Sequence, residues 1–389
     1  MENGNFAQSG PLPPPGLRPA PERDRFQPLM TSDFTGGGID ALPVETRSIG
    51  NVALDQRIRD LIRDYGCETS CDLVQEMIVT ALKIGRDDLS IADLKLFNRS
   101  LKELRYAARV FNRYGDRLKV AVFGSARTPR TDPAFEIARL LGQRIREAGY
   151  MVITGGGDGI MGAAQEGAGR EDSFGLNIRL PFEQRANETI EGDPKLVSFN
   201  YFFTRKLNFV KETHAVVLMP GGFGTFDEGF EVLTLMQTGK ARIFPVVFLD
   251  RPGGTYWQTV IDLLRGHLLE RGLISPEDFN FFHLATDADD AVAHINRFYR
   301  NFISYRWVRR TLVFRLRRAL TPQALETLQN EYADVLAKGR FRICGALPEE
   351  ANQPELAGLP RLVFQPHRTR FGRLRALIDA VNQAETLPE

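Results

Sequence analysis

The feature that most constrains the fold is a repeated order of apolar run, glycine-containing loop and helical pattern, which begins at Lys119. Glycines directly follow the apolar runs at residues 120–123 and 151–154, and a glycine comes three positions after the run at residues 215–218. Strand and helix in alternation predict a parallel sheet with helices on its faces. We therefore expect an α/β fold, a Rossmann-like doubly wound parallel sheet, over residues 119–300.

The flanking residues carry other patterns. Residues 1–50 are rich in proline, glycine and polar side chains without periodicity, so we expect a disordered or loosely attached tail. Residues 51–118 place apolar side chains at helical spacing, which predicts a helical extension used for packing or oligomer contact. Residues 301–389 mix strand-like and helical runs, which predicts a small C-terminal α+β appendage.

Composition excludes several classes of protein. The net charge of +1 makes nucleic acid an unlikely partner, and no apolar run approaches the roughly 18 residues that a membrane span needs. The N-terminus lacks the basic and apolar regions of a signal peptide, and three cysteines fit a reducing compartment, so we expect a cytoplasmic protein. Cys67 and Cys71 are interpreted as packed thiols, because a second pair of zinc ligands is missing.

The segment Pro220-Gly221-Gly222-Phe223-Gly224-Thr225 lies where an apolar run ends and a helical pattern begins. Free N–H groups at a helix N-terminus, unobstructed by Cβ atoms, favour a phosphate group. Asp227 and Glu228 follow directly, where a phosphate alone would not favour carboxylates. The combination predicts chemistry on a phosphorylated substrate.

Two more loops belong to the same predicted sheet edge. Residues 157–162 match the dinucleotide pattern G-x-G-x-x-G, but they open the second strand–helix unit of the sheet rather than the first. We therefore favour a nucleotide site over a dinucleotide site, with Gly124 and Ser125 in a third loop. Arg205 and Lys206 begin a helix, where the macrodipole disfavours cations, so either an anionic partner or a solvated pair is expected.

These motifs together resemble the LOG ("Lonely guy") family of nucleoside 5′-monophosphate phosphoribohydrolases, which includes the enzymes that activate cytokinins. The family motif P-G-G-x-G-T-x-x-E is complete at residues 220–228, and the resemblance covers roughly residues 119–300. It implies hydrolysis of the N-glycosidic bond of an AMP-like purine nucleotide to free base and ribose 5-phosphate. It also implies Arg205 and Glu228 as catalytic residues, and a homodimer or larger homo-oligomer with the active site near the dimer interface.

The resemblance also implies a set of substrate-binding residues. Phe203 and Thr204 stand where short plant-type members have Met-His, and residues 180–187 look more like a longer bacterial subgroup. Glu183 and Asn187 are alternatives for a family acid that approaches the base, and Asp227 is expected to be exposed. The expected contacts are Gly124, Ser125, Gly156, Gly157, Met161, Glu183, Asn187, Lys206, Gly221, Gly222, Gly224 and Thr225.

Family members are often labelled lysine decarboxylases, but no lysine context for pyridoxal phosphate is recognisable, and we expect no cofactor. No histidines pair at ligand spacing, so no metal is expected. One alternative function is a nucleotide- or cofactor-binding protein without turnover. Another is a scaffold in which arginines such as Arg315 and Arg317 bind an anionic effector, although a solvated or interface-lining face is favoured for them.

Overall fold

The structure is a computed structural model that describes residues 47–68, 70–180, 185–351 and 353–388. The chain divides into two compact units, with the boundary between Tyr106 and Ala107. Residues 1–46 of the predicted tail lie outside the described residues, and so does Glu183. The division into four parts therefore stays a prediction.

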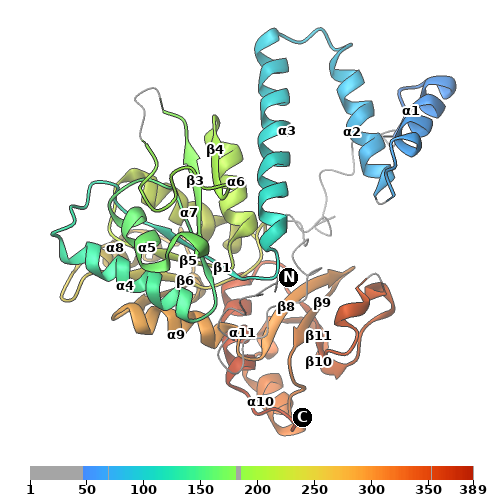
Figure 1. Cartoon of the computed structure of the whole chain (residues 1–389). Helices are drawn as coiled ribbons and strands as arrows, with labels where there is room; N and C mark the ends of the chain where they lie inside the picture. The colour runs from blue at the N-terminus through green and yellow to red at the C-terminus, as the bar shows by residue number, and fades with distance from the viewer. Residues whose placement is uncertain (1–46, 69, 181–184, 352, 389) are drawn as a thin grey trace, which may run out of the picture. The chain divides into compact units, whose positions relative to one another are not determined.

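The larger unit contains a sheet of seven parallel strands in the order β4-β3-β2-β1-β5-β6-β7 (Figure 1). The order reverses beside β1, because β2 to β4 extend on one side of it and β5 to β7 on the other. In an open sheet of this kind the ligand crevice lies at the carboxyl ends of the strands at the reversal, here β1 and β5. The strands are β1 (Lys119–Phe123), β2 (Met151–Thr154), β3 (Ser173–Ile178), β4 (Leu196–Phe199), β5 (Ala215–Leu218), β6 (Val246–Leu249) and β7 (Phe282–Ala285).

Helices cover both faces of this sheet, which confirms the doubly wound fold predicted from the sequence. Helices α4, α5 and α9 pack together on one face, and right-handed crossovers place α6, α7 and α8 on the other (Figure 1). The helices are α4 (Pro133–Glu147), α5 (Ile160–Ala168), α6 (Phe202–Glu212), α7 (Phe223–Gln237), α8 (Tyr256–Leu263), continued by the π-helix η4 (Leu264–Leu269), and α9 (Ala288–Phe298).

Local signals set where these helices begin and how closely they approach. Asp132 caps α4 by accepting a hydrogen bond from the Ala134 N–H at 2.8 Å, with Pro133 in the first turn. Helices α4 and α5 meet through glycines, because a Cβ on Gly142 would overlap the Ala164 carbonyl. The strands beneath are fully buried, so the core of the unit lies between the sheet and its two helical layers.

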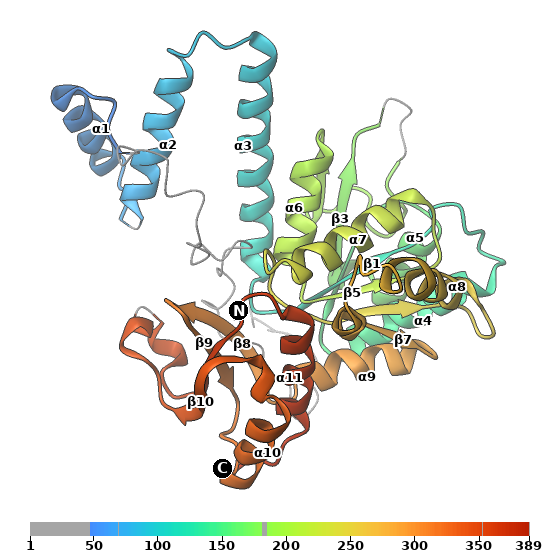
Figure 2. The ribbon, with the colours of Figure 1, turned by 180° about the vertical axis from the view of Figure 1, so that it is seen from behind.

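The C-terminal part of the larger unit is an antiparallel four-stranded sheet in the order β10-β11-β9-β8, with two helices. Helix α11 packs against α9 of the Rossmann-like part (Figure 2). The elements are β8 (Phe302–Val308), β9 (Thr311–Leu316), α10 (Pro322–Glu331), β10 (Leu336–Cys344), β11 (Arg361–Pro366) and α11 (Phe371–Gln383). The α+β character predicted for residues 301–389 is confirmed, while β8 was not predicted.

Arg315 is buried in this sheet. Its Nη2 atom lies 2.9 Å from Glu350 Oε1, and Arg361 Nε lies 3.0 Å from Glu350 Oε2. A buried charge must be paired in this way, since an isolated one would be costly to remove from water. Arg315 therefore serves the interior of the C-terminal part and is not available to an effector.

The smaller unit holds the predicted helical extension: α1 (Val52–Asp64), α2 (Cys71–Ile84) and the first part of α3 (Ile91–Phe111). Ser90 caps α3 by accepting a hydrogen bond from the Asp93 N–H at 3.2 Å. Ile58 and Ile62 of α1 form a small core with Val79 of α2, and both Cys67 and Cys71 pack against it as predicted. None of the helices in the described part of the chain is long and apolar enough to cross a bilayer.

The described residues also form short helical segments between these elements. They are η2 (Asn112–Tyr114), η3 (Arg170–Asp172), η5 (Pro276–Phe281), η6 (Ala333–Val335), η7 (Pro348–Glu350) and η8 (Pro354–Leu356).

Candidate active site

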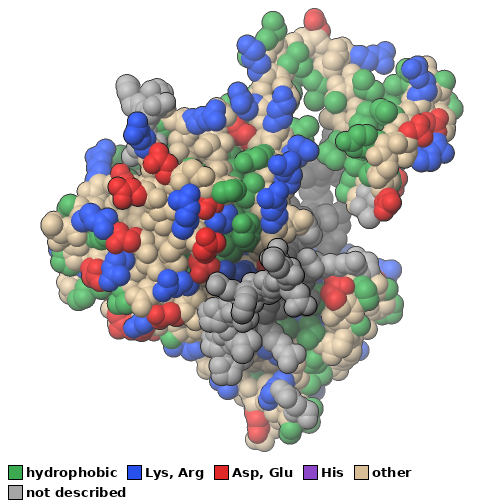
Figure 3. Space-filling model, in the orientation of Figure 1, with side chains coloured by type: hydrophobic (Ala, Val, Ile, Leu, Met, Phe, Trp, Pro, Cys, Tyr) green, Lys and Arg blue, Asp and Glu red, His purple; other side chains and the backbone are tan. Residues whose placement is uncertain are grey.

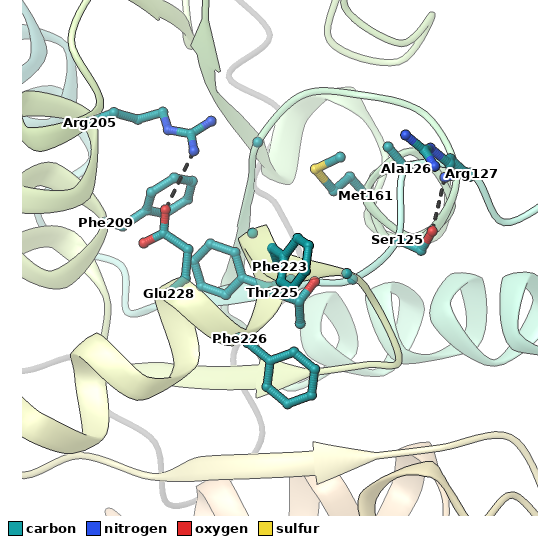
Figure 4. A pocket seen from close by; sticks show the side chains of 15 residues that line it. Ser125, Ala126, Arg127, Met161, Arg205, Phe209, Phe223, Thr225, Phe226 and Glu228 are labelled. Atoms are coloured by element: carbon teal, nitrogen blue, oxygen red, sulfur yellow. Dashed lines mark hydrogen bonds and ion pairs between the residues drawn. The ribbon is translucent and has the colours of Figure 1, made fainter. Parts of the chain in front are cut away.

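A cavity of about 620 Å³ opens at the carboxyl ends of β1 and β5, where the strand order reverses. Its walls come from the loops after β1, β2 and β5, together with α6 and α7 (Figure 4). This volume lies within the range of pockets that enclose small ligands. The lining residues are Phe123, Gly124, Ser125, Ala126, Arg127, Gly155, Met161, Arg205, Phe209, Gly222, Phe223, Gly224, Thr225, Phe226 and Glu228.

The N-terminus of α7 forms one wall of the cavity. Gly222 precedes the helix, and the Thr225 N–H turns back to the Gly222 carbonyl at 3.0 Å. A Cβ on Gly221 would overlap the Thr225 hydroxyl and lie 3.0 Å from the Ser125 nitrogen, so only glycine fits there. The Ser125 N–H donates to the Pro220 carbonyl at 3.1 Å, which joins the loops after β1 and β5. The sequence-predicted phosphate loop is therefore a compact helix N-terminus facing the cavity.

Tyr256 of α8 fixes this loop from outside. Its hydroxyl donates to the Gly221 carbonyl at 2.7 Å, and its N–H donates to Asp250 Oδ2 at 2.9 Å. Its ring also stacks on Phe226, with centroids 6.0 Å apart. The role of Tyr256 was not predicted from the sequence, because the residue is 35 positions from Gly221 and no local pattern links them.

The glycine-rich loop after β2 closes against the loop after β1. A Cβ on Gly155 or Gly157 would lie 2.8 or 2.9 Å from the Met161 side chain, and Gly159 has a φ of +63°. The Ile160 N–H donates to the Ser125 carbonyl at 3.0 Å. The glycines thus allow close backbone packing around Met161, which lines the cavity.

Asn187 is buried beneath this loop. Its Nδ2 atom donates to the carbonyls of Gly156 and Gly157 at 3.1 and 2.9 Å, and to Gln165 Oε1 at 2.6 Å. The side chain amide is therefore engaged with the loop rather than with the cavity lining. A direct contact of Asn187 with substrate stays a prediction, and the structure gives it a supporting role.

Arg205 of α6 and Glu228 of α7 meet on one side of the cavity, with Nη2 and Oε1 3.4 Å apart (Figure 4). The Glu228 side chain is only 5% exposed. Burial raises the pKa of Glu228 from 4.5 to about 7, although Lys206 and Arg205 oppose this rise. A carboxyl with such a pKa exchanges protons near neutral pH and suits general acid–base or electrostatic catalysis.

The guanidinium of Arg205 is held by aromatic rings as well as by the carboxylate. Its Cζ atom lies 5.1 Å from the centre of the Phe202 ring and 5.8 Å from that of Phe209. Burial lowers the pKa of Arg205, and the charge of Glu228 opposes this. The Nε atom of Arg205 is buried without a hydrogen-bond partner among the described residues.

Lys206 turns toward the carboxylates on α7. Its Nζ atom lies 2.9 Å from Asp227 Oδ2, 2.9 Å from Glu231 Oε2 and 3.9 Å from Glu228 Oε2. Burial lowers the pKa of Lys206, but the hydrogen bonds to Asp227 and Glu231 outweigh this, so its pKa is raised. Asp227 is exposed, as predicted, and pairs with this lysine. A contact of Lys206 with substrate stays a prediction.

The structure brings most of the predicted residues to one place. Eight of them line the cavity: Gly124, Ser125, Met161, Arg205, Gly222, Gly224, Thr225 and Glu228. The apolar lining was not predicted from the sequence, and it consists of Phe123, Ala126, Phe209, Phe223 and Phe226. Arg127, a cation of the lining, was not predicted either. Within the described residues, no three His, Cys, Asp or Glu side chains gather in a way that could hold a metal ion.

Comparisons with known proteins place these motifs in a family. A family model described as "Possible lysine decarboxylase" matches residues 161–295. The chain is 31% identical to a rice protein, the probable cytokinin riboside 5′-monophosphate phosphoribohydrolase LOG4, over 45% of this chain and 75% of that protein. It is 26% identical to the Arabidopsis thaliana cytokinin riboside 5′-monophosphate phosphoribohydrolase LOG7, over 47% of this chain and 83% of that protein.

Among solved structures, the molybdenum cofactor carrier protein of Chlamydomonas reinhardtii matches 46% of this chain and 97% of its own, with 20% identity and a TM-score of 0.33. The molybdenum cofactor binding protein of Rippkaea orientalis matches 46% and 94%, with 20% identity and a TM-score of 0.32. The match to the rice protein covers most of that relative, and the complete P-G-G-x-G-T-x-x-E motif forms a wall of the cavity. The chain therefore belongs to the LOG family.

Proposed function

We propose that this protein hydrolyses the N-glycosidic bond of purine nucleoside 5′-monophosphates, AMP-like nucleotides in particular, to free base and ribose 5-phosphate. The observation that carries the proposal is the buried Glu228, which faces Arg205 in the cavity that also holds the N-terminus of α7. The relatives are named as phosphoribohydrolases of cytokinin riboside 5′-monophosphates, which supports a nucleotide substrate for this chain.

The phosphate is assigned to the N-terminus of α7. The first N–H groups of a helix have no partner within the helix, and the macrodipole favours an anion there. The backbone of Gly222 and Gly224 provides such groups beside the Thr225 hydroxyl. Ser125 lies on the neighbouring loop and provides a further hydroxyl. In this arrangement the phosphate anchors the nucleotide while the reaction takes place further along the cavity.

Glu228 acts at the reacting carbon. Breaking the bond between C1′ and the base nitrogen leaves positive charge on the ribose, which a carboxylate stabilises. A water oxygen forms the new bond to C1′, and the electron pair of the broken bond leaves with the base. Glu228 accepts the proton that water loses and later releases it to solvent, while the departing base takes up a proton from solvent, so the products are neutral base and ribose 5-phosphate.

Arg205 positions Glu228 and the ribose. Its Nη2 atom holds one carboxylate oxygen, and the part of the guanidinium that lines the cavity provides a donor for a ribose hydroxyl. The apolar part of the cavity suits the planar base, because Phe209, Phe223 and Phe226 offer aromatic surfaces. The site therefore combines an anion-binding end, a catalytic carboxylate and an apolar region.

The test is a product assay with a matched pair of substrates. The protein is incubated with AMP or with adenosine, and adenine and the sugar product are quantified by chromatography and mass spectrometry. We expect adenine and ribose 5-phosphate from AMP, and at least about 100-fold slower release from adenosine, since the phosphate contacts would be lost. Binding of AMP without any cleavage would instead support a nucleotide-binding protein without turnover.

A further inference from the structure

The smaller unit exposes an unusual amount of apolar surface. Thirteen of the twenty-three large apolar side chains that are exposed in the described residues lie between Val52 and Tyr106. Monomeric proteins rarely leave large contiguous apolar patches in water, and those that exist commonly mark interaction sites. Residues 161–295, which the family model matches, lie outside this unit.

One part of this surface is the outer face of α2. Val74, Ile78 and Val79 pack toward α1, but Leu73 and Met77 on the opposite side are 57% and 52% exposed. Apolar residues on two sides of one helix indicate that both sides pack against a neighbour. We call Leu73, Met77, Ala81 and Ile84 the outer face of α2, a row with helical spacing of four, four and three residues.

The other part is a seam along α3. Leu94, Phe97, Leu101 and Leu104 follow each other at intervals of three, four and three residues, the spacing of a helix that packs against another helix. Leu94, Phe97 and Leu101 are 39%, 46% and 56% exposed. We call these four residues the α3 seam. Helices α2 and α3 stand apart (Figures 1 and 2), so neither surface covers the other within the chain.

We propose that the smaller unit is a dimerisation module, in which the outer face of α2 packs on the α3 seam of a second copy of this chain. Each copy carries both surfaces, so a two-fold symmetric exchange covers both surfaces in both copies. A single unrelated helix would cover only one of them. The occupant that satisfies the whole surface is therefore the chain itself.

The exposed area agrees with a dimer. Leu73, Met77, Leu94, Phe97 and Leu101 together leave on the order of 500 Å² uncovered per copy, at about 200 Å² for a fully exposed large side chain. Two copies then bury on the order of 1,000 Å², about the area at which a specific interface begins. Polar residues frame the seam, since Lys95, Arg99 and Lys102 lie exposed beside it. Figure 3 shows basic side chains along α3 and hydrophobic ones over α2.

The first test measures the mass of the full chain in solution by light scattering after size-exclusion chromatography. We expect Met77→Glu and Leu101→Glu each to reduce the mass to one half, because a charge would be buried in the contact. Leu273→Glu is the matched control, since Leu273 is 68% exposed in the larger unit, and it should keep the original mass. A wild-type monomer, or an unchanged mass in both helix variants, would overturn the proposal.

A second test remains informative even if a charged variant unfolds. The substitution Phe97→p-benzoylphenylalanine places a photo-crosslinker in the α3 seam of the full chain. Irradiation should give a product of two chains on a denaturing gel, with the crosslink mapped by mass spectrometry to the outer face of α2. Crosslinks formed only within one chain would show that α2 closes on α3 of the same copy, and the proposal would be wrong.

Discussion

The substitution Glu228→Gln tests the electrostatics of the site without any knowledge of the substrate. The raised pKa of Glu228 means that the folded chain binds this proton more tightly than the unfolded chain does. The group therefore adds stability that is fully present below its ordinary pKa of 4.5 and is lost as pH rises through about 7. The Gln variant keeps a neutral side chain at every pH, so it does not lose this contribution.

The size of the effect follows from the two pKa values. A tenfold change in an ionisation constant corresponds to about 1.4 kcal/mol, so the rise from 4.5 to about 7 amounts to about 3 kcal/mol in total. Between pH 5 and pH 8, about 2.5 kcal/mol of this is lost from the wild type relative to the variant. For a domain of this size, that corresponds to about 5 to 10 °C in Tm.

The assay is thermal unfolding of both proteins across pH 5 to 8 at constant ionic strength. The Tm of Glu228→Gln minus that of the wild type should become more positive by about 5 to 10 °C as pH rises through this window. Glu136→Gln is a matched control, because Glu136 is an exposed residue of α4 paired with Arg139. A Tm difference that stays constant from pH 5 to 8 would refute the assignment of a buried carboxyl with a pKa near 7.

Three further predictions concern the loop that we propose binds the phosphate. Thr225→Val removes one hydroxyl at nearly constant volume, and KM for AMP should rise about 10-fold to 100-fold in steady-state assays, as expected for a hydrogen bond to a charged group. Tyr256→Phe releases the Gly221 carbonyl, and KM should rise about 2-fold to 10-fold while kcat stays nearly unchanged. A fall in kcat as large as the rise in KM would contradict a positioning role. Gly221→Ala should lower Tm because its Cβ overlaps Thr225, while Gly222→Ala, with nothing within 4 Å, should leave Tm unchanged in the same thermal scan.

Much of the fold was predictable because local pattern and topology agree. Most strands of the parallel sheet are short apolar runs followed by a helical pattern, and right-handed crossovers leave few alternatives for their connection. Strand β8 was missed because Phe302–Val308 directly follows α9, with no strong turn signal between them. The burial of Arg315 was also missed, since its partner Glu350 is 35 residues away.

The site was predictable to the extent that its chemistry lies in contiguous motifs. Glycines at strand ends, together with Arg205 and Glu228, mark the cavity because parallel strands bring their carboxyl ends to one edge of the sheet. The roles of Tyr256 and Asn187 depend on hydrogen bonds between segments far apart in sequence. The pairing of Lys206 with Asp227 and Glu231 depends on how α6 packs against α7, which no single motif specifies.

The most direct test of the proposed function is the release of ribose 5-phosphate from AMP under single-turnover conditions. With AMP saturating, we predict that Glu228→Gln lowers the rate by about 100-fold to 1,000-fold, the usual cost of removing a preorganised electrostatic group. Glu136→Gln should keep the wild-type rate. Release of ribose 5-phosphate by Glu228→Gln at the wild-type rate would contradict the account.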